Sequence, residues 1–421
     1  MNDIEINKFN TIRLPQLAWY DDNDLELQFP PSWDVSVCYM KGYAAPSLSE
    51  EQIKQAFTKP IGTPRICDLA NDKKEVVILF DDLSRPTKVY QLVPYILQEL
   101  EEAGIADDRI RFIATLGNHA AMKRMDFTKK LGEDVMARFA VYNHNAYENC
   151  TYVGDTSRGT RVEINSEVMA CELKIAIGSI VPHGEAGFGG GAKAIIPGVS
   201  SINTTWSNHV VLGHPIDQPP HPTTGIGKVD SNIVRLDMEE AARMAGLDII
   251  VNVVPNGKRD PVGLFVGDVV AAHREGVKLA REVCAAKPAK DVDIIVTNNY
   301  SKSDETAIRG FSTGDWFKID GGSLVTIANT PDGEITHYLG GRFGKTVAGR
   351  GWRKPDSLPP RVNEFIIFAP YPDRRFGDQA APPESIIWAR TWLEVLEKLI
   401  EVHQGKARVA IVPDVGMQFF P

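Results

Sequence analysis

The richest candidate for chemistry is a glycine-dense segment over residues 179–198. In it, His183 precedes a run of glycines and Lys193 follows that run. Such a loop lets backbone N–H groups approach an anionic ligand closely. Lysine adds a positive charge or an amine nucleophile, and histidine moves protons near neutral pH. The segment therefore predicts a ligand-binding loop with acid–base chemistry, although glycines alone would also fit a tight turn.

Two further segments place polar groups directly after apolar runs of strand length. Asp82 and Arg85 follow residues 75–80, and His119 follows residues 109–115. Ligands of open α/β sheets sit beyond the carboxyl ends of parallel strands, so these side chains are expected at one sheet edge. The planar guanidinium of Arg85 suits a carboxylate or a phosphate. Helix capping by Asp82 or the nearby serine explains the first segment equally well.

A third histidine lies downstream of the glycine loop. His209 falls sixteen residues after Lys193, in a predicted helix that begins at a serine cap near residue 200. A helical histidine can be a satisfied partner within the core. It can also reach back to a metal or cofactor held by the glycine loop.

Three common motifs fail at the glycine loop. The Walker pattern needs glycine directly before lysine, but Ala192 precedes Lys193 and no serine or threonine follows it. The dinucleotide pattern G-x-G-x-x-A begins at Gly187, well past the preceding strand, and a Pro-Gly pair interrupts the helix that should follow. The H-x-E of zinc deaminases is present at His183, but no P-C-x-x-C lies downstream.

The elements that position these residues follow the alternating pattern of an α/β protein. Residues 75–80, 89–103 and 109–115 predict strand, helix and strand, a β-α-β unit that favours a parallel sheet. Further strands are predicted at 139–142, 174–177, 249–254, 293–297, 323–328, 364–368 and 408–412, and further helices at 232–245, 269–285 and 385–403.

A proline-containing segment near residue 288 predicts a domain boundary. We expect an N-terminal domain over residues 1–288 that binds a cofactor and carries the catalytic residues. Residues 406–421 are a candidate segment for completing it, and residues 289–405 form a smaller C-terminal α/β domain. The predicted fold is therefore α/β, with two domains, mainly parallel sheets and an active site in the cleft between them.

Composition argues against several classes of function. The 421 residues carry a formal net charge of -9, which is unfavourable for binding nucleic acid or an anionic membrane. The sequence shows neither a run of eighteen apolar residues nor a secretory leader pattern. Its five cysteines are scattered without a CxxC pair, which excludes a cysteine zinc cage and predicts reduced thiols in the cytoplasm.

Together these segments resemble the lactate racemase family of nickel-pincer nucleotide enzymes. The resemblance runs from about residue 81 to residue 268, and it rests on the order and spacing of His119, His183, Lys193 and His209. It implies that a pyridinium-3-thioamide-5-thiocarboxylate mononucleotide is linked to Lys193 and that His209 is a nickel ligand. It also implies that cofactor-maturation proteins act on the chain. The cofactor's phosphate is then expected against the glycine loop, at Gly189, Gly190 and Gly191.

The resemblance also implies a mechanism. His119 and His183 match the family's two acid–base histidines, one for each configuration of a 2-hydroxy acid. One histidine takes the hydroxyl proton, the C2 hydride moves to the cofactor, and the planar 2-keto acid can receive the hydride on either face. Arg85 is expected to grip the substrate carboxylate, with Asp82 orienting its neighbours.

The second domain departs from the family's pattern. The family has a glutamine and a lysine three residues apart there, where this chain has Thr306 and Arg309. Arg309 favours a second carboxylate or a hydroxyl-rich chain, so we expect a 2-hydroxy acid larger than lactate. Three alternatives stay open: a nickel-free lyase or isomerase acting on a sugar acid, a nicotinamide dehydrogenase, and a non-catalytic protein that binds a phosphate ligand.

Overall fold

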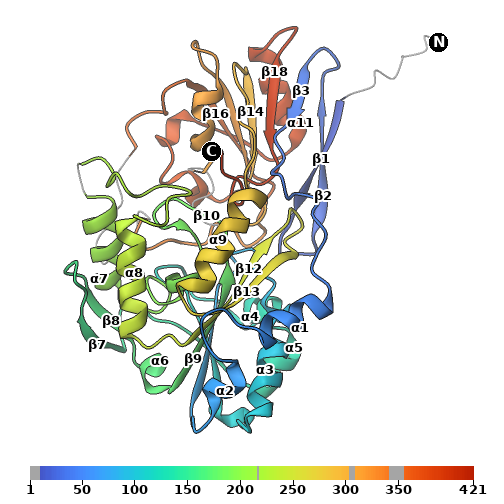
Figure 1. Cartoon of the computed structure of the whole chain (residues 1–421). Helices are drawn as coiled ribbons and strands as arrows, with labels where there is room; N and C mark the ends of the chain where they lie inside the picture. Colours follow the sequence, from blue (N-terminus) through green and yellow to red (C-terminus); the bar gives the residue numbers. More distant parts are fainter. Residues whose placement is uncertain (1–9, 216–217, 303–308, 341–354) are drawn as a thin grey trace.

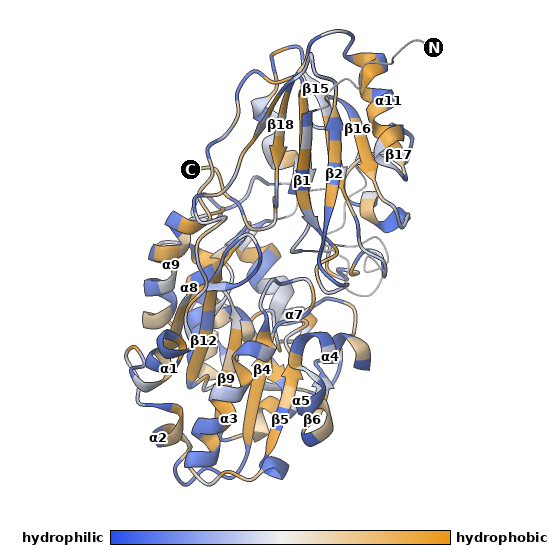
Figure 2. Cartoon of the chain, turned by 90° about the vertical axis from the view of Figure 1, so that its right-hand side faces the viewer, coloured by the Kyte–Doolittle hydropathy of each residue, from blue (hydrophilic) through white to orange (hydrophobic). Residues whose placement is uncertain are grey.

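Two six-stranded sheets form the cores of two domains (Figure 1). The structure is a computed structural model that describes residues 10–215, 218–302, 309–340 and 355–421. In both sheets the strands are strongly apolar, as Figure 2 shows in orange. Among the described residues, no helix combines the length and apolar character needed to cross a bilayer.

The first sheet has the order β13-β12-β9-β4-β5-β6. All its neighbouring strands are parallel except β12 and β13. Its strands are β4 (Val76–Phe80), β5 (Ile110–Ala114), β6 (Ala140–Asn143), β9 (Leu173–Ser179), β12 (Ile249–Pro255) and β13 (Pro261–Gly267).

Alternate side chains of β4 enter two separate cores, which explains why all five are buried. Ile78 and Phe80 pack toward the helix α3, whereas Val77 and Leu79 pack toward α8. The predicted β-α-β unit is confirmed as β4, α3 and β5. The helices of this domain are α1 (Glu50–Thr58), α2 (Ile66–Ala70), α3 (Val93–Glu102), α4 (Arg124–Leu131), α5 (Glu133–Arg138), α6 (Ser166–Ala170), α7 (Ile202–Thr205), α8 (Ile233–Met244) and α9 (Ala271–Val283).

Shorter elements complete the first domain around the site. A β-hairpin, β7 (Cys150–Asp155) and β8 (Arg161–Asn165), covers one side, and β10 (Pro182–His183) pairs with β11 (Gly187–Phe188) in the glycine loop. A π-helix spans Trp206–Gly213. Short 3-10 helices lie at Val89–Gln91, Asp107–Arg109 and Gly191–Ala194.

The second sheet is entirely parallel, with the order β17-β16-β15-β14-β18-β3. A hairpin of β1 (Asn10–Gln16) and β2 (Asn23–Phe29) packs into the same core. The sheet strands are β3 (Asp34–Val37), β14 (Ile294–Asn298), β15 (Gly322–Ile327), β16 (Val362–Phe368), β17 (Ile386–Ala389) and β18 (Arg408–Val412). The helix α11 (Trp392–Val402) and 3-10 turns at Phe311–Trp316, Arg374–Gly377 and Pro383–Ser385 complete this domain.

The N-terminal segment corrects the expected division of the chain. Residues 10–37 belong to the second domain, because β3 pairs with β18 and the side chains of Leu14 and Leu27 are fully buried in the second core. Figure 1 shows this blue segment beside the red C-terminal strands. Strand β18 likewise lies in the second sheet, so it does not complete the first one. Pairing between opposite ends of a chain leaves no local sequence signal.

One predicted helix also begins later than expected. Residues 386–389 do not form the start of the helix predicted over 385–403 but extend the second sheet as β17 beside β16. The helix α11 then starts after Thr391, whose hydroxyl accepts from the backbone N–H of Glu394 in a capping box. An apolar run next to an open sheet edge gains more from strand pairing than from one further helical turn.

Candidate active site

The residues singled out from the sequence converge on one cavity of about 760 Å³ between the two domains. The first domain contributes the ends of its central strands and the glycine loop. The second domain contributes Ser312 and His337, and the tail after β18 contributes Phe419. The ten predicted site residues that line the cavity are Asp82, Arg85, His119, His183, Gly189, Gly190, Gly191, Lys193, His209 and Arg309.

A fully buried lysine fixes the loop after β4. Lys130, on α4, places Nζ 2.7 Å from Asp81 Oδ1 and donates to the carbonyl oxygens of Arg85 and Thr87 at 3.0 Å. The hydroxyl of Thr87 donates to the other oxygen of Asp81. Asp81 and Lys130 therefore stabilise the conformation of the loop. The adjacent Asp82 lines the cavity.

Asp82 holds His119 instead of capping a helix. Its Oδ2 lies 2.6 Å from Nδ1 of His119, and its Oδ1 accepts from the backbone N–H of Ser84 at 2.9 Å. Helix α3 begins only after Leu92, without a side-chain cap, so the capping interpretation of Asp82 does not hold. Burial opposes ionisation of Asp82, but His119 and Arg85 lower its pKa from 3.8 to about 2.

This contact decides how His119 can react. Because the carboxylate accepts only, Nδ1 of His119 carries the proton, and Nε2 is left as the basic nitrogen. Arg85 lies against the same loop, where its Nη1 donates to Ser84 Oγ at 2.8 Å and to the Ser84 carbonyl oxygen at 3.0 Å. A base and a guanidinium thus lie together at the carboxyl edge of the sheet.

His183 lies at the start of the glycine loop, on β10. Its Nδ1 accepts from the backbone N–H groups of Glu185 at 3.2 Å and Ala186 at 3.3 Å, so the neutral ring carries its proton on Nε2. Burial, followed by the nearby positive charges of Lys193 and Arg85, holds the pKa of His183 well below 6.5. The ring is therefore neutral at physiological pH.

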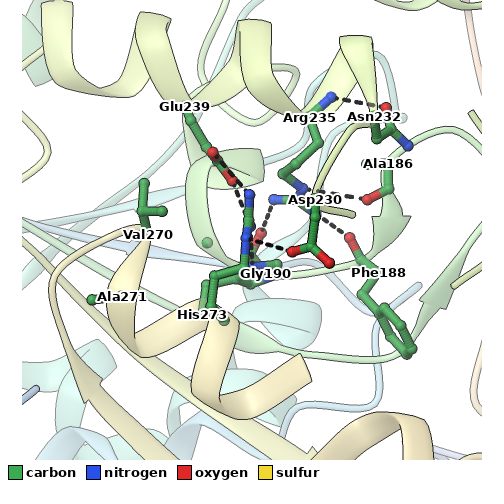
Figure 3. A network of polar contacts seen from close by, with 12 residues as sticks. Ala186, Phe188, Gly190, Asp230, Asn232, Arg235, Glu239, Val270, Ala271 and His273 are labelled. Carbon is green, nitrogen blue, oxygen red and sulfur yellow. Dashed lines mark hydrogen bonds and ion pairs between the residues drawn. The ribbon is translucent and has the colours of Figure 1, made fainter. Parts of the chain in front are cut away.

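The carbonyl groups of the glycine loop are held by side chains from α8 and α9 (Figure 3). Arg235 is fully buried and donates to the carbonyl oxygens of Ala186, Phe188 and Gly190. Nε2 of His273 lies 2.9 Å from the carbonyl oxygen of Gly189. With its carbonyls bonded on the helix side, the loop has a fixed backbone against the cavity.

Glycine is required at these positions for steric reasons. Gly190 has φ +72°, and a Cβ there would lie 2.6 Å from Oδ1 of Asn252. Gly191 has φ +60°, and its Cβ would lie 2.9 Å from the ring of His273. The same Asn252 oxygen accepts from Gly191 N–H at 2.7 Å. The glycines thus let the loop approach its supporting side chains more closely than any other residue would.

His209 lies on the π-helix, a rare element that is frequent at functional sites. The preceding helix α7 begins at Ser201, whose hydroxyl accepts from Thr204 N–H, close to the predicted serine cap. Nδ1 of His209 is buried and has no hydrogen-bond partner among the described residues. Burial, then the charges of Lys193 and His337, keeps its pKa well below 6.5.

Comparisons with known proteins identify the family. A family model described as the lactate racemase N-terminal domain matches residues 20–218. A lactate racemase from Thermoanaerobacterium thermosaccharolyticum is 31% identical over 294 residues, which cover 68% of this chain and 67% of the relative. A lactate racemase from Lactiplantibacillus plantarum is 30% identical over 293 residues, which cover 68% of each protein. The chain belongs to the lactate racemase family.

Solved structures agree with the fold. The lactate racemase apoprotein from Thermoanaerobacterium thermosaccharolyticum superposes with a TM-score of 0.72 at 24% identity, covering 98% of this chain and all of that one. A protein from Thermotoga maritima superposes with a TM-score of 0.64 at 17% identity, covering 89% of this chain and 99% of that one. The α/β fold expected from the sequence is therefore confirmed as that of the lactate racemase structure.

The residues of this lactate racemase family member fit the cofactor implied by the sequence. Lys193 and His209 line the same cavity as the glycine loop. Nδ1 of His209 is buried in a neutral ring and has no hydrogen-bond partner in the described part of the chain, so it can offer a lone pair to a metal. Imidazole is a suitable ligand for Ni(II). The expected role of the glycines in holding the cofactor's phosphate is not supported at two of the three positions, because the backbone N–H of Gly189 donates to Val181 O and that of Gly191 donates to Asn252 Oδ1.

Several residues of the site had no signal in the sequence. Lys130 lies in the last turn of α4 and Arg235 in the first turn of α8, and Lys302 donates from Nζ to the carbonyl oxygen of Pro182 at 2.9 Å. His337 lies in a loop of the second domain and reaches the cavity only through folding. Thr306, which was expected to act beside Arg309, lies outside the described residues.

Proposed function

We propose that this protein racemises or epimerises a 2-hydroxy acid larger than lactate, with a nickel-pincer nucleotide attached to Lys193. The observation that carries the proposal is the convergence of His119, His183, Lys193 and His209 on one cavity. Membership of the lactate racemase family supports the reaction class. Bound at Lys193 and His209, the cofactor would supply an acceptor for the C2 hydride.

The chain's own residues provide substrate binding and proton transfer. Arg85 binds the substrate carboxylate with its planar guanidinium. Nε2 of His119 takes the hydroxyl proton as the C2–H bond breaks, and Asp82 stabilises the cationic imidazole that forms. His183, whose Nδ1 accepts from two backbone N–H groups, carries the proton of its neutral ring on Nε2 and donates from there to the substrate oxygen of the opposite configuration.

The far wall of the cavity favours a substrate with a polar tail. Arg309, Ser312 and His337 of the second domain line the cavity and place polar groups opposite the proposed base. Arginine pairs well with a second carboxylate and also donates to hydroxyl groups. The proposed substrate is therefore a 2-hydroxy acid that carries further oxygen atoms.

Nickel content and intact mass together test the cofactor proposal. We expect the wild-type chain, produced together with the cofactor-maturation proteins, to contain nickel and a covalent adduct. Lys193→Ala should lose the adduct, and His209→Ala should keep it while losing nickel. Activity on an acid without any adduct would favour the nickel-free lyase or isomerase instead.

A panel of 2-hydroxy acids, followed by chiral chromatography, then tests the reaction. We expect inversion at C2 for acids with oxygen-bearing tails. Turnover of lactate alone would contradict the larger substrate, and nicotinamide-dependent oxidation would favour a dehydrogenase.

A further inference from the structure

A second-domain loop is joined to the segment that carries His119. Backbone N–H of Ala120 donates to Thr336 O at 2.9 Å, and backbone N–H of Tyr338 donates to Asn118 O at 2.8 Å. These two hydrogen bonds form an antiparallel bridge in which His337 is paired with His119. The bridge fixes His337 opposite the proposed base, and the two ring centroids lie 5.1 Å apart.

The second domain holds this loop from its other side. Nη1 of Arg375 donates to Thr336 Oγ1 at 2.9 Å, and Asp373 Oδ2 accepts from the backbone N–H of Glu334 at 2.9 Å. Arg375 and Asp373 are themselves an ion pair. The position of His337 is therefore set by contacts to both domains, which suits a residue that must recognise a ligand between them.

The ring of His337 has a defined donor. Its Nδ1 accepts from the backbone N–H of Gly340 at 3.1 Å, so the neutral imidazole carries its proton on Nε2. The residue lines the cavity together with Arg309 and Ser312. The same cavity is lined by His209, the proposed metal ligand.

We propose that His337 selects the substrate, by donating a hydrogen bond to an oxygen on C3 or C4 of the 2-hydroxy acid. This inference rests on the proposed function and names its substrate class, which is 2-hydroxy acids with a hydroxyl or carboxylate beyond C2. The methyl group of lactate offers no acceptor, and a polar group buried against it without a partner is unfavourable. Arg309 supplies positive charge on the same wall and adds to the preference for an anionic tail.

Two substitutions separate the hydrogen bond from the shape of the side chain. His337→Leu removes the donor and keeps a similar volume, whereas His337→Gln keeps an N–H donor. His403→Gln is the matched control, because this second-domain histidine contacts Ser323 Oγ at 2.7 Å and is absent from the cavity wall. The cofactor-loaded enzymes are compared on malate and glycerate, which carry the extra oxygen, and on 2-hydroxybutyrate and lactate, which do not.

Two readouts are taken for each enzyme and acid: kcat/KM for inversion at C2, and the increase in Tm on adding the acid. For the wild type, kcat/KM and the increase in Tm should both be larger with malate or glycerate than with 2-hydroxybutyrate. His337→Leu should reduce that preference by about tenfold, the value of one hydrogen bond. His337→Gln should retain most of the preference, and His403→Gln all of it.

The outcomes separate this inference from the proposed function. If the wild type inverts these acids and His337→Leu keeps the wild-type preference, the role of His337 is refuted and the function stands. If no acid is inverted but the Tm preference is present and lost in His337→Leu, the role stands and the function fails. A wild type that favours lactate and 2-hydroxybutyrate, or that responds to none of the acids, refutes the role of His337.

Discussion

Replacing Asp82 with asparagine should change which nitrogen of His119 carries the proton. Oδ1 of Asp82 accepts from the backbone N–H of Ser84 at 2.9 Å, and a backbone N–H can only donate. In Asp82→Asn the amide oxygen must therefore take this position, and the amide NH₂ group then faces Nδ1 of His119. That nitrogen becomes an acceptor, the proton moves to Nε2, and the base is lost.

The size of the effect follows from the charge on Asp82. Its pKa falls from 3.8 to about 2 in spite of burial, mainly because of the His119 charge. The difference corresponds to about 2.4 kcal/mol, which is the net of the cost of burial and the favourable interactions with His119, Arg85 and Ser84. Losing it would reduce kcat on the order of 60-fold, and the reversed tautomer removes general-base catalysis, which typically contributes about 10²–10⁴-fold. We expect kcat to fall by about 10²–10⁴-fold, with a smaller change in KM.

Kinetics and NMR together test this reasoning. The kcat of Asp82→Asn is measured at matched nickel content, and ¹⁵N shifts of the imidazoles report which ring nitrogen of His119 is protonated. Ser84→Ala is the control, because it removes the serine hydroxyl but keeps the backbone N–H that orients Asp82. An Asp82→Asn enzyme with Nδ1 of His119 still protonated, or with kcat within about fivefold of the wild type, would refute the argument.

Two further predictions concern the buried groups around the site. Arg235→Gln should lower the free energy of unfolding on the order of 4 kcal/mol, because three loop carbonyls lose their donor. Urea titration should show the exposed Arg243→Gln, on the same helix, within about 0.5 kcal/mol of the wild type. Burial lowers the pKa of His144 from 6.5 to about 4, so its contribution is present above pH 6.5 and lost as pH falls toward 4. Urea titrations between pH 7 and pH 4 should therefore show about 3 kcal/mol more loss of stability in the wild type than in His144→Gln.

The parts of the site that the sequence predicted are those that depend on local order. A short apolar run followed by polar residues defines a strand end, and neighbouring parallel strands bring their ends to one edge. The sequence alone therefore predicts that Asp82 and His119 lie at the same sheet edge. The glycine run around Gly190 predicted a close backbone approach for the same local reason.

The parts that the sequence did not predict depend on distant pairing. Strand β3 joins β18 from the opposite end of the chain, and the loop carrying His337 meets His119 across the domain boundary. Arg235 also gave no signal, since an arginine in an amphipathic helix is normally solvent-exposed. Arg235 can be buried because its guanidinium donates to three backbone carbonyl oxygens of a loop that lies some fifty residues earlier in the sequence.

In the proposed function, the first domain carries out the chemistry and the second domain recognises the substrate tail. The family model matches residues 20–218, which include Asp82, His119, Lys193 and His209, whereas Arg309 and the other second-domain wall residues lie beyond that match. Proton and hydride transfer need fixed positions, and a sheet edge with buried supports such as Lys130 provides them. A substrate tail needs only a complementary cavity wall. Substitutions in loops of the second domain can change that wall without disturbing the residues of the first domain. A change of substrate within this fold is therefore expected to fall on the second domain first.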